Sequence, residues 1–161
     1  MNKLTVQMER IIGNATPEDT QILSDFLTNL EKKQQGEFTT YLTAGLNMSR
    51  EITADSCKVT IPNTSFIHNS ISIPHGGILA VLLDTAMGVL ANSKCRPGYG
   101  AVTTNLSIHY LAVTNDETIS AEARIVRNGK HTIVAEGNIF QKDGKHIATS
   151  TASFFIIPET I

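Results

Sequence analysis

Asp84 is the only charged residue in the long, mostly apolar segment from Gly76 to Ser93. A carboxylate can serve as a general base or as a nucleophile. On a mostly buried helix it needs hydrogen-bond partners or ordered water, because desolvating a carboxylate alone is costly. The segment therefore predicts a polar cavity around Asp84. The alternative is a surface carboxylate on an amphipathic helix, but a solvated face normally carries several charges.

His75, Gly76 and Gly77 open the same segment. Glycine inside a helix costs about 1 kcal/mol relative to alanine, so a pair of glycines indicates that something approaches the backbone. The unpaired N–H groups of a helix N-terminus attract an anion or a polarised carbonyl oxygen. We therefore expect both glycine amides to be uncovered and available to a ligand. A flexible joint between loop and helix, with no ligand, is the alternative.

Gly76 and Asp84 are too far apart on one helix to act on the same carbonyl group, since a rise of ~1.5 Å per residue separates them by about 12 Å. On a helical wheel, the stripe beside Asp84 has almost no side chains and consists of Gly77, Ala80, Gly88 and Ala91. A second helix could approach this stripe closely. We therefore predict a composite site formed by two antiparallel helices, which requires at least a homodimer. The opposite face, expected in the core, holds Ile78, Leu79, Leu82, Leu83, Val89 and Leu90.

Two amphipathic helices are predicted in the first third of the chain. Apolar residues recur with helical spacing from Leu4 to Ile12 and again from Ile22 to Leu30. Thr16 can cap the second helix and Pro17 suits its first position, and the helix should end by Gly36. We expect residues 1–36 to be a helical extension of a single domain spanning residues 1–161.

Extended segments dominate the rest of the sequence, around residues 46–48 and 57–61 and then at 101–111, 118–127, 130–142 and 145–157. Asn128-Gly129 and Asp143-Gly144 predict two-residue hairpin turns with positive φ at both positions. His109 is expected on the sheet surface and Tyr110 in the core. An antiparallel sheet can bury the apolar helix by curling around it, so we predict an α+β fold with its core at residues 44–157.

Composition excludes several classes of protein. The 161 residues carry 13 Lys and Arg against 15 Asp and Glu, which gives no electrostatic reason to expect nucleic acid or an anionic membrane as a partner. Cys57 and Cys95 are isolated and the N-terminus lacks a secretion-signal pattern, which indicates a reducing, cytoplasmic setting. The longest apolar stretch is far shorter than the ~20 residues that span a bilayer. The histidines lack metal-ligand spacing, so no metal site is expected.

The string from Asn69 to Gly77, followed by Leu82-Leu83-Asp84-Thr85-Ala86, resembles the hotdog-fold acyl-CoA thioesterases, specifically their phenylacetyl-CoA thioesterase (PaaI-type) branch. The family's later pattern is similar to residues 102–110, 127–130 and 143–148. The resemblance covers roughly residues 46–157. It implies a hotdog fold, in which a curved six-stranded antiparallel sheet wraps around the long helix. It also implies a dimer that joins two sheets edge to edge, and commonly a homotetramer.

The resemblance further implies the hydrolysis of acyl-CoA thioesters. Asp84 matches the catalytic carboxylate, and the backbone N–H of Gly76 or Gly77 would hold the thioester oxygen. Asn69 and His75 match positions that place the attacking water and the thioester, while Thr103 stands where relatives often have Ser or Thr. No cofactor is expected, because coenzyme A is part of the substrate. Whether Asp84 is a general base or a nucleophile stays open.

The candidate site for the nucleotide end of coenzyme A is the basic hairpin, which consists of Arg124, Arg127, Asn128, Gly129 and Lys130. A solvated hairpin tip without a ligand is the alternative reading. Two other functions fit the same fold. One is a non-catalytic acyl-CoA or lipid sensor, and the other, ranked lower, is a hotdog-fold hydratase or dehydratase.

Overall fold

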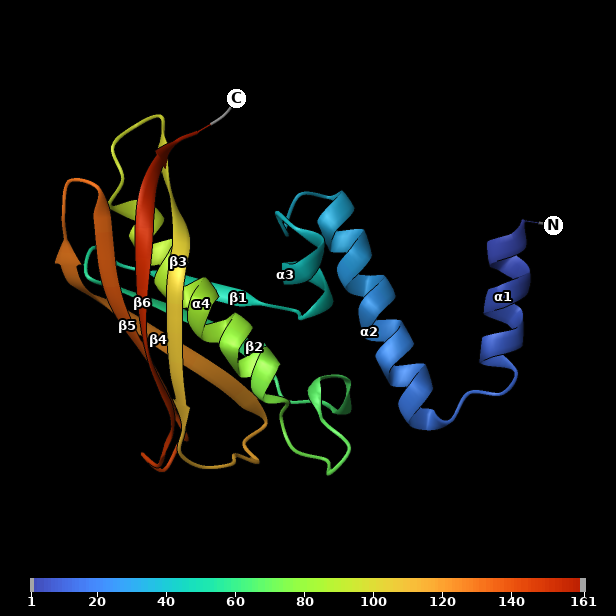
Figure 1. The fold of residues 1–161 in the computed structure, drawn as a ribbon. Helices are drawn as coiled ribbons and strands as arrows, with labels where there is room; N and C mark the ends of the chain where they lie inside the picture. Colours follow the sequence, from blue (N-terminus) through green and yellow to red (C-terminus); the bar gives the residue numbers. More distant parts are fainter. Residues whose placement is uncertain (1, 160–161) are drawn as a thin grey trace. The chain divides into compact units, whose positions relative to one another are not determined.

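The computed structural model describes residues 2–159, and the chain divides into two compact units, residues 1–47 and 48–161. The first unit is helical and contains α1 (Lys3–Ile12), α2 (Pro17–Gln34) and α3 (Tyr41–Gly45) (Figure 1). Thr16 and Asp19 form a reciprocal capping box at the start of α2, as the sequence predicted for Thr16. The short helix α3 was not expected, because five residues are too few to show helical periodicity.

The strand expected at residues 46–48 is wrong. Leu46 and Asn47 form the turn that ends α3, and Asn47 adopts a positive φ of 46°. A residue in this left-handed conformation does not continue a strand. The first strand begins two residues later, at Ser49.

The second unit is a six-stranded antiparallel sheet with one long helix, α4 (Gly76–Ser93), packed against it. The strand order is β1-β2-β4-β5-β6-β3. The strands are β1 (Ser49–Ile52), β2 (Ser56–Pro62), β3 (Tyr99–Tyr110), β4 (Thr118–Asn128), β5 (Thr132–Phe140) and β6 (His146–Pro158), with a short 3-10 helix, η1 (Ser65–Ile67), after β2. The sheet curves around α4, which contacts β2 to β6 (Figure 1). This confirms the predicted α+β class and hotdog fold.

α4 has the bounds that the sequence predicted. Its buried residues are Leu79, Leu82, Leu83, Ala86, Met87, Leu90 and Ala91. Ile78 and Val89, which were expected in the core, are only half-buried, whereas Ala91 from the small-residue stripe is buried. The core face is therefore rotated slightly from the predicted one. By length and composition α4 could cross a membrane, but the core helix of a globular fold passes the same test.

Both predicted two-residue hairpin turns are longer than expected. Between β4 and β5, the N–H of Gly129 bonds to Thr132 O at 3.0 Å, and neither Asn128 nor Gly129 has a positive φ. Glycine is required there for space, because a Cβ at Gly129 would lie 2.8 Å from Thr132 O. Between β5 and β6, Gly144 alone takes a positive φ of 88°, in a five-residue loop.

Candidate active site

The N-terminus of α4 is capped by the side chain of His75. The backbone of His75 is extended (φ −67°, ψ 130°), and its Nδ1 accepts the N–H of Gly77 at 2.9 Å. An imidazole nitrogen that accepts a hydrogen bond must be unprotonated. The expectation that both glycine amides are uncovered is therefore wrong for Gly77, which the neighbouring histidine already satisfies.

Tyr110 holds the same turn from the sheet. Its hydroxyl donates to the carbonyl oxygen of Gly76 at 2.8 Å, so the carbonyl and the N–H of the Gly76–Gly77 peptide are both bound by side chains. Among the described residues, the N–H of Gly76 has no protein acceptor. It is the remaining open donor of the two glycines. Tyr110 is 52% exposed, so its predicted place in the core is wrong.

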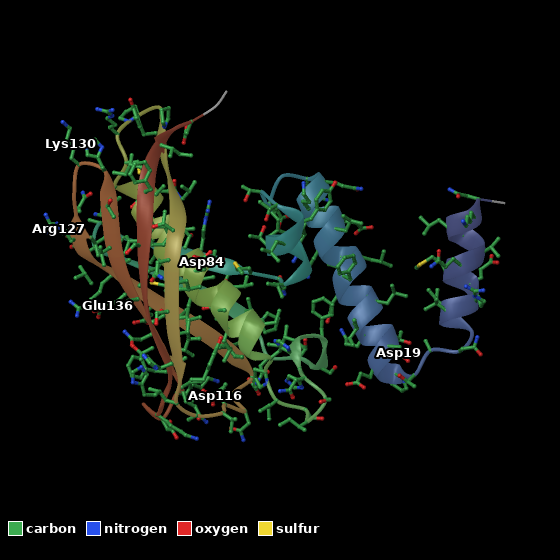
Figure 2. All side chains as sticks on the ribbon, viewed as in Figure 1. Asp19, Asp84, Asp116, Arg127, Lys130 and Glu136 are labelled. Atoms are coloured by element: carbon green, nitrogen blue, oxygen red, sulfur yellow. The ribbon has the colours of Figure 1, made fainter. Side chains whose placement is uncertain are left out.

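Asp84 lies at mid-length on α4, as Figure 2 shows, and is half-buried. Thr103 of β3 donates its hydroxyl to Asp84 Oδ1 at 3.0 Å. A hydroxyl donor fixes the orientation of a carboxylate. Two of the sequence-predicted residues are thus brought together, and the hydrogen-bond partner that Asp84 was expected to need is present.

A third link joins β3 to α4 near the end of the helix. The side chain of Asn92 accepts the N–H of Ala101 at 2.8 Å and donates to Gly88 O at 2.9 Å. The sequence analysis missed both Asn92 and Tyr110. The contacts that give them these roles, Asn92 with Ala101 and Tyr110 with Gly76, join residues of different elements, so no local spacing predicts them.

Within residues 2–159, the side chain of Asn69 is hydrogen-bonded to the backbone of the loop before α4, and its predicted role in placing water and thioester stays a prediction. Its side-chain oxygen accepts the backbone N–H of Ile71 at 3.0 Å and that of Ile73 at 3.4 Å. These bonds shape the loop that leads into His75. The described structure therefore gives Asn69 a role in loop geometry and does not show a contact with Asp84.

The basic hairpin is only partly available to a ligand. Arg124 pairs with Glu136 on the neighbouring strand at 2.5 Å, and Arg127 lies exposed on β4 (Figure 2). A pocket of about 400 Å³ lies beside the hairpin tip. Its polar lining residues include Lys94, Arg96, Asn128, Gly129, Lys130 and His131. Lys94 and Arg96 were not predicted for this site, because they follow α4 and lie far from the hairpin along the sequence.

Cys95 also lines this pocket but is poorly suited to nucleophilic chemistry. Burial, followed by the nearby negative charge of Glu159, raises the pKa of the Cys95 thiol. The reactive thiolate is therefore scarce at neutral pH. Within residues 2–159, no group of three or more His, Cys, Asp or Glu side chains is arranged to hold a metal ion.

Comparisons with known proteins identify the family and the fold of the chain. A family model described as the thioesterase superfamily matches residues 73–148, which include the start of α4, Asp84 and Thr103. A Bacillus halodurans protein, crystallised with CoA, is 35% identical with a TM-score of 0.88, and the match covers 95% of this chain and 99% of that one. No protein of curated function matches the chain.

Two further solved structures share the fold. A thioesterase from Haemophilus influenzae is 18% identical with a TM-score of 0.71, over 80% of this chain and 90% of that one. The E. coli PaaI protein from the phenylacetic acid degradation operon is 24% identical with a TM-score of 0.68, over 85% of this chain and 99% of that one. At these identities the likeness concerns the fold alone.

Proposed function

The chain belongs to the thioesterase superfamily, and we propose that it hydrolyses acyl-CoA thioesters to a free acid and CoA. The observation that carries the proposal is that one helix presents both an oriented carboxylate, Asp84, at mid-length and an open N–H, that of Gly76, at its start. Coenzyme A enters as part of the substrate, and the reaction uses no cofactor. We place this activity in the cytoplasm, in one thioesterase domain of residues 1–161 in which residues 1–36 are an extension.

In the proposed reaction, the Gly76 N–H donates to the thioester oxygen and stabilises the negative charge that develops there. Asp84 either removes a proton from the attacking water or attacks the carbonyl carbon itself. If Asp84 acts as a base, hydroxide adds to the carbonyl carbon, the carbon–sulfur bond breaks, and the proton taken by Asp84 passes to sulfur, which gives the free acid and CoA thiol. If Asp84 is the nucleophile, CoA leaves as a thiolate and an acyl–Asp84 anhydride forms. Water then hydrolyses this anhydride, which releases the free acid, restores the carboxylate and supplies the proton to sulfur. The Thr103 hydroxyl holds the Asp84 carboxylate in position.

The two reactive groups must come from different copies of the chain, since about 12 Å separates them along one helix. The open edge of β3 supports this dimer. β3 is an edge strand of twelve residues, whereas β1 at the other edge has only four and exposes Arg50 and Glu51. Long unpaired edges favour pairing with another chain, and short charged edges oppose it. We propose that two β3 strands pair, and that two such dimers form a homotetramer.

The pocket beside the β4–β5 hairpin is the proposed site for the nucleotide phosphates of CoA. Lys94, Arg96 and Lys130 bring three positive charges to one cavity, which suits phosphate groups. Substituting Lys130→Ala should raise KM for an acyl-CoA and leave KM unchanged for the matching acyl-N-acetylcysteamine, which lacks the nucleotide. Equal effects on both substrates would remove this pocket from the proposal.

The test of hydrolysis measures free thiol released from a panel of acyl-CoA esters. Wild type should be active and Asp84→Asn inactive. Gly76→Pro removes the N–H and adds a ring, and the helix should still form because proline is well tolerated at a first helical position and the extended His75 backbone suits a following proline. Gly76→Ala keeps the N–H and is the matched control, since a Cβ there would make an ordinary 3.4 Å contact with Tyr110.

Loss of activity in Gly76→Pro but not in Gly76→Ala would support the amide as the donor to the thioester oxygen. Equal turnover by wild type and Asp84→Asn would refute the role of the carboxylate. Tight binding of every acyl-CoA without release of thiol would instead favour a non-catalytic sensor.

A further inference from the structure

We infer that Tyr110 is a positioning residue for the proposed thioester site and acts through the backbone of Gly76. The inference rests on the proposed function. The Tyr110 hydroxyl donates to Gly76 O at 2.8 Å, while His75 Nδ1 binds the N–H on the other side of the same peptide group at 2.9 Å. The Gly76–Gly77 peptide is thus held from both sides. The Gly76 N–H belongs to the preceding peptide, whose carbonyl, His75 O, accepts the N–H groups of Ile78 and Leu79. We infer that Tyr110 limits rotation about the one residue, Gly76, that joins the two peptides.

This restraint matters because of the residues that form the first turn. Two consecutive glycines lose more conformational entropy on folding than any other pair, and helix ends fray. Without side chains, the two glycines contribute no packing of their own to hold the turn. The ring of Tyr110 does so, since it lies against Gly76, where an added Cβ would be 3.4 Å from the ring carbon that bears the hydroxyl.

A bulge in β3 gives Tyr110 this role. Side chains alternate between the two faces of a strand, so residues seven apart, such as Thr103 and Tyr110, would point to opposite faces. The register shifts between Thr103 and Asn105, where one extra residue is inserted. Thr103 and Tyr110 therefore both face α4, at Asp84 and at Gly76. One edge strand positions both halves of the proposed chemistry.

The hydrogen bond of Tyr110 should contribute more to turnover than to stability. Tyr110 is 52% exposed, so water can replace much of its hydrogen bond, and the bond adds little to the free energy of unfolding. In contrast, an amide can stabilise an oxyanion only when its N–H points toward the oxygen, so turnover depends on the direction of the Gly76 amide. Removing only the hydroxyl should therefore lower kcat while the folded state persists.

The experiment compares Tyr110→Phe, which keeps the ring, with wild type in the thiol-release assay. We expect kcat to fall about three- to tenfold, the loss of one ordinary hydrogen bond, with KM nearly unchanged. Amide hydrogen exchange should be faster in the first turn of α4. The matched control is Thr60→Val on β2. It removes a hydroxyl that is hydrogen-bonded to Ser120 Oγ on β4 at 2.7 Å, and it should leave kcat unchanged.

An unchanged kcat in Tyr110→Phe, with active wild type, overturns this inference and leaves the proposed function intact. A rise in KM alone also overturns it, because the hydroxyl then binds substrate. Inactive wild type refutes the proposed function itself. If Tyr110→Phe fails to fold, Tyr110→Leu is assayed in its place, and an unchanged kcat in that variant likewise overturns the inference.

Discussion

Thr103→Val tests the orientation of the proposed catalytic carboxylate. The substitution keeps the shape of the side chain and removes the hydroxyl that donates to Asp84 Oδ1 at 3.0 Å. A hydrogen bond to a charged group contributes roughly 1.5–3 kcal/mol. Because Thr103 is exposed and Asp84 only half-buried, the lower end applies, and about 1.4 kcal/mol corresponds to a tenfold change in rate.

We therefore expect kcat for Thr103→Val to fall about tenfold, with a smaller change in KM. Thr103→Ser retains the donor and should keep most of the activity. The assay follows free thiol under saturating acyl-CoA, with thermal unfolding as a check of the fold. An active Thr103→Val enzyme, or a Thr103→Ser enzyme as impaired as Thr103→Val, would show that the hydroxyl does not position Asp84.

Three further predictions concern stability and reactivity. Gly137→Ala should destabilise the fold by about 1–3 kcal/mol in urea titrations, since a Cβ there would lie 3.0 Å from a serine hydroxyl of β6. Hydrogen bonds from the side chain and backbone of Thr16 lower the pKa of Asp19. The resulting stabilisation of α2 is therefore present above the ordinary pKa of 3.8 and is lost as pH falls through the lower folded-state pKa. Asp19→Asn should flatten that part of the pH profile of helix content measured by circular dichroism. Because burial and then Glu159 raise the pKa of Cys95, its alkylation by iodoacetamide should be slow at neutral pH and faster in Glu159→Gln; rapid modification of wild type at neutral pH would contradict this.

The central helix could be predicted from the sequence because its signals are local. Glycines mark its start, an Arg-Pro-Gly run follows its end, and a lone acid stands out in an apolar segment. The hypothesis of a composite site rests on spacing alone, as Gly76 and Asp84 are eight residues apart, and it stays a prediction. These inferences needed no knowledge of how the strands pair.

The contact that holds the start of α4 could not be predicted, because it depends on strand register. Tyr110 was expected on the core side of its strand, but nothing in the sequence placed its hydroxyl on Gly76 O. Alternation along β3 gives no sign of the extra residue at Thr104, and that residue decides that Tyr110 faces the helix. The predicted lengths of the two hairpin turns were wrong for a related reason. Gly129 was read as a residue with positive φ, but it is required by the close approach of Thr132 O.

Mixing two inactive variants measures most directly whether the site is shared between copies. Asp84→Asn and Gly76→Pro chains are unfolded together and refolded at equal amounts, alongside each variant alone. Half of the dimers should be mixed, and each mixed dimer has one intact site, so about a quarter of wild-type turnover should return. If the mixture stays as inactive as its components, although mixed dimers form, each site belongs to a single chain and the account is wrong.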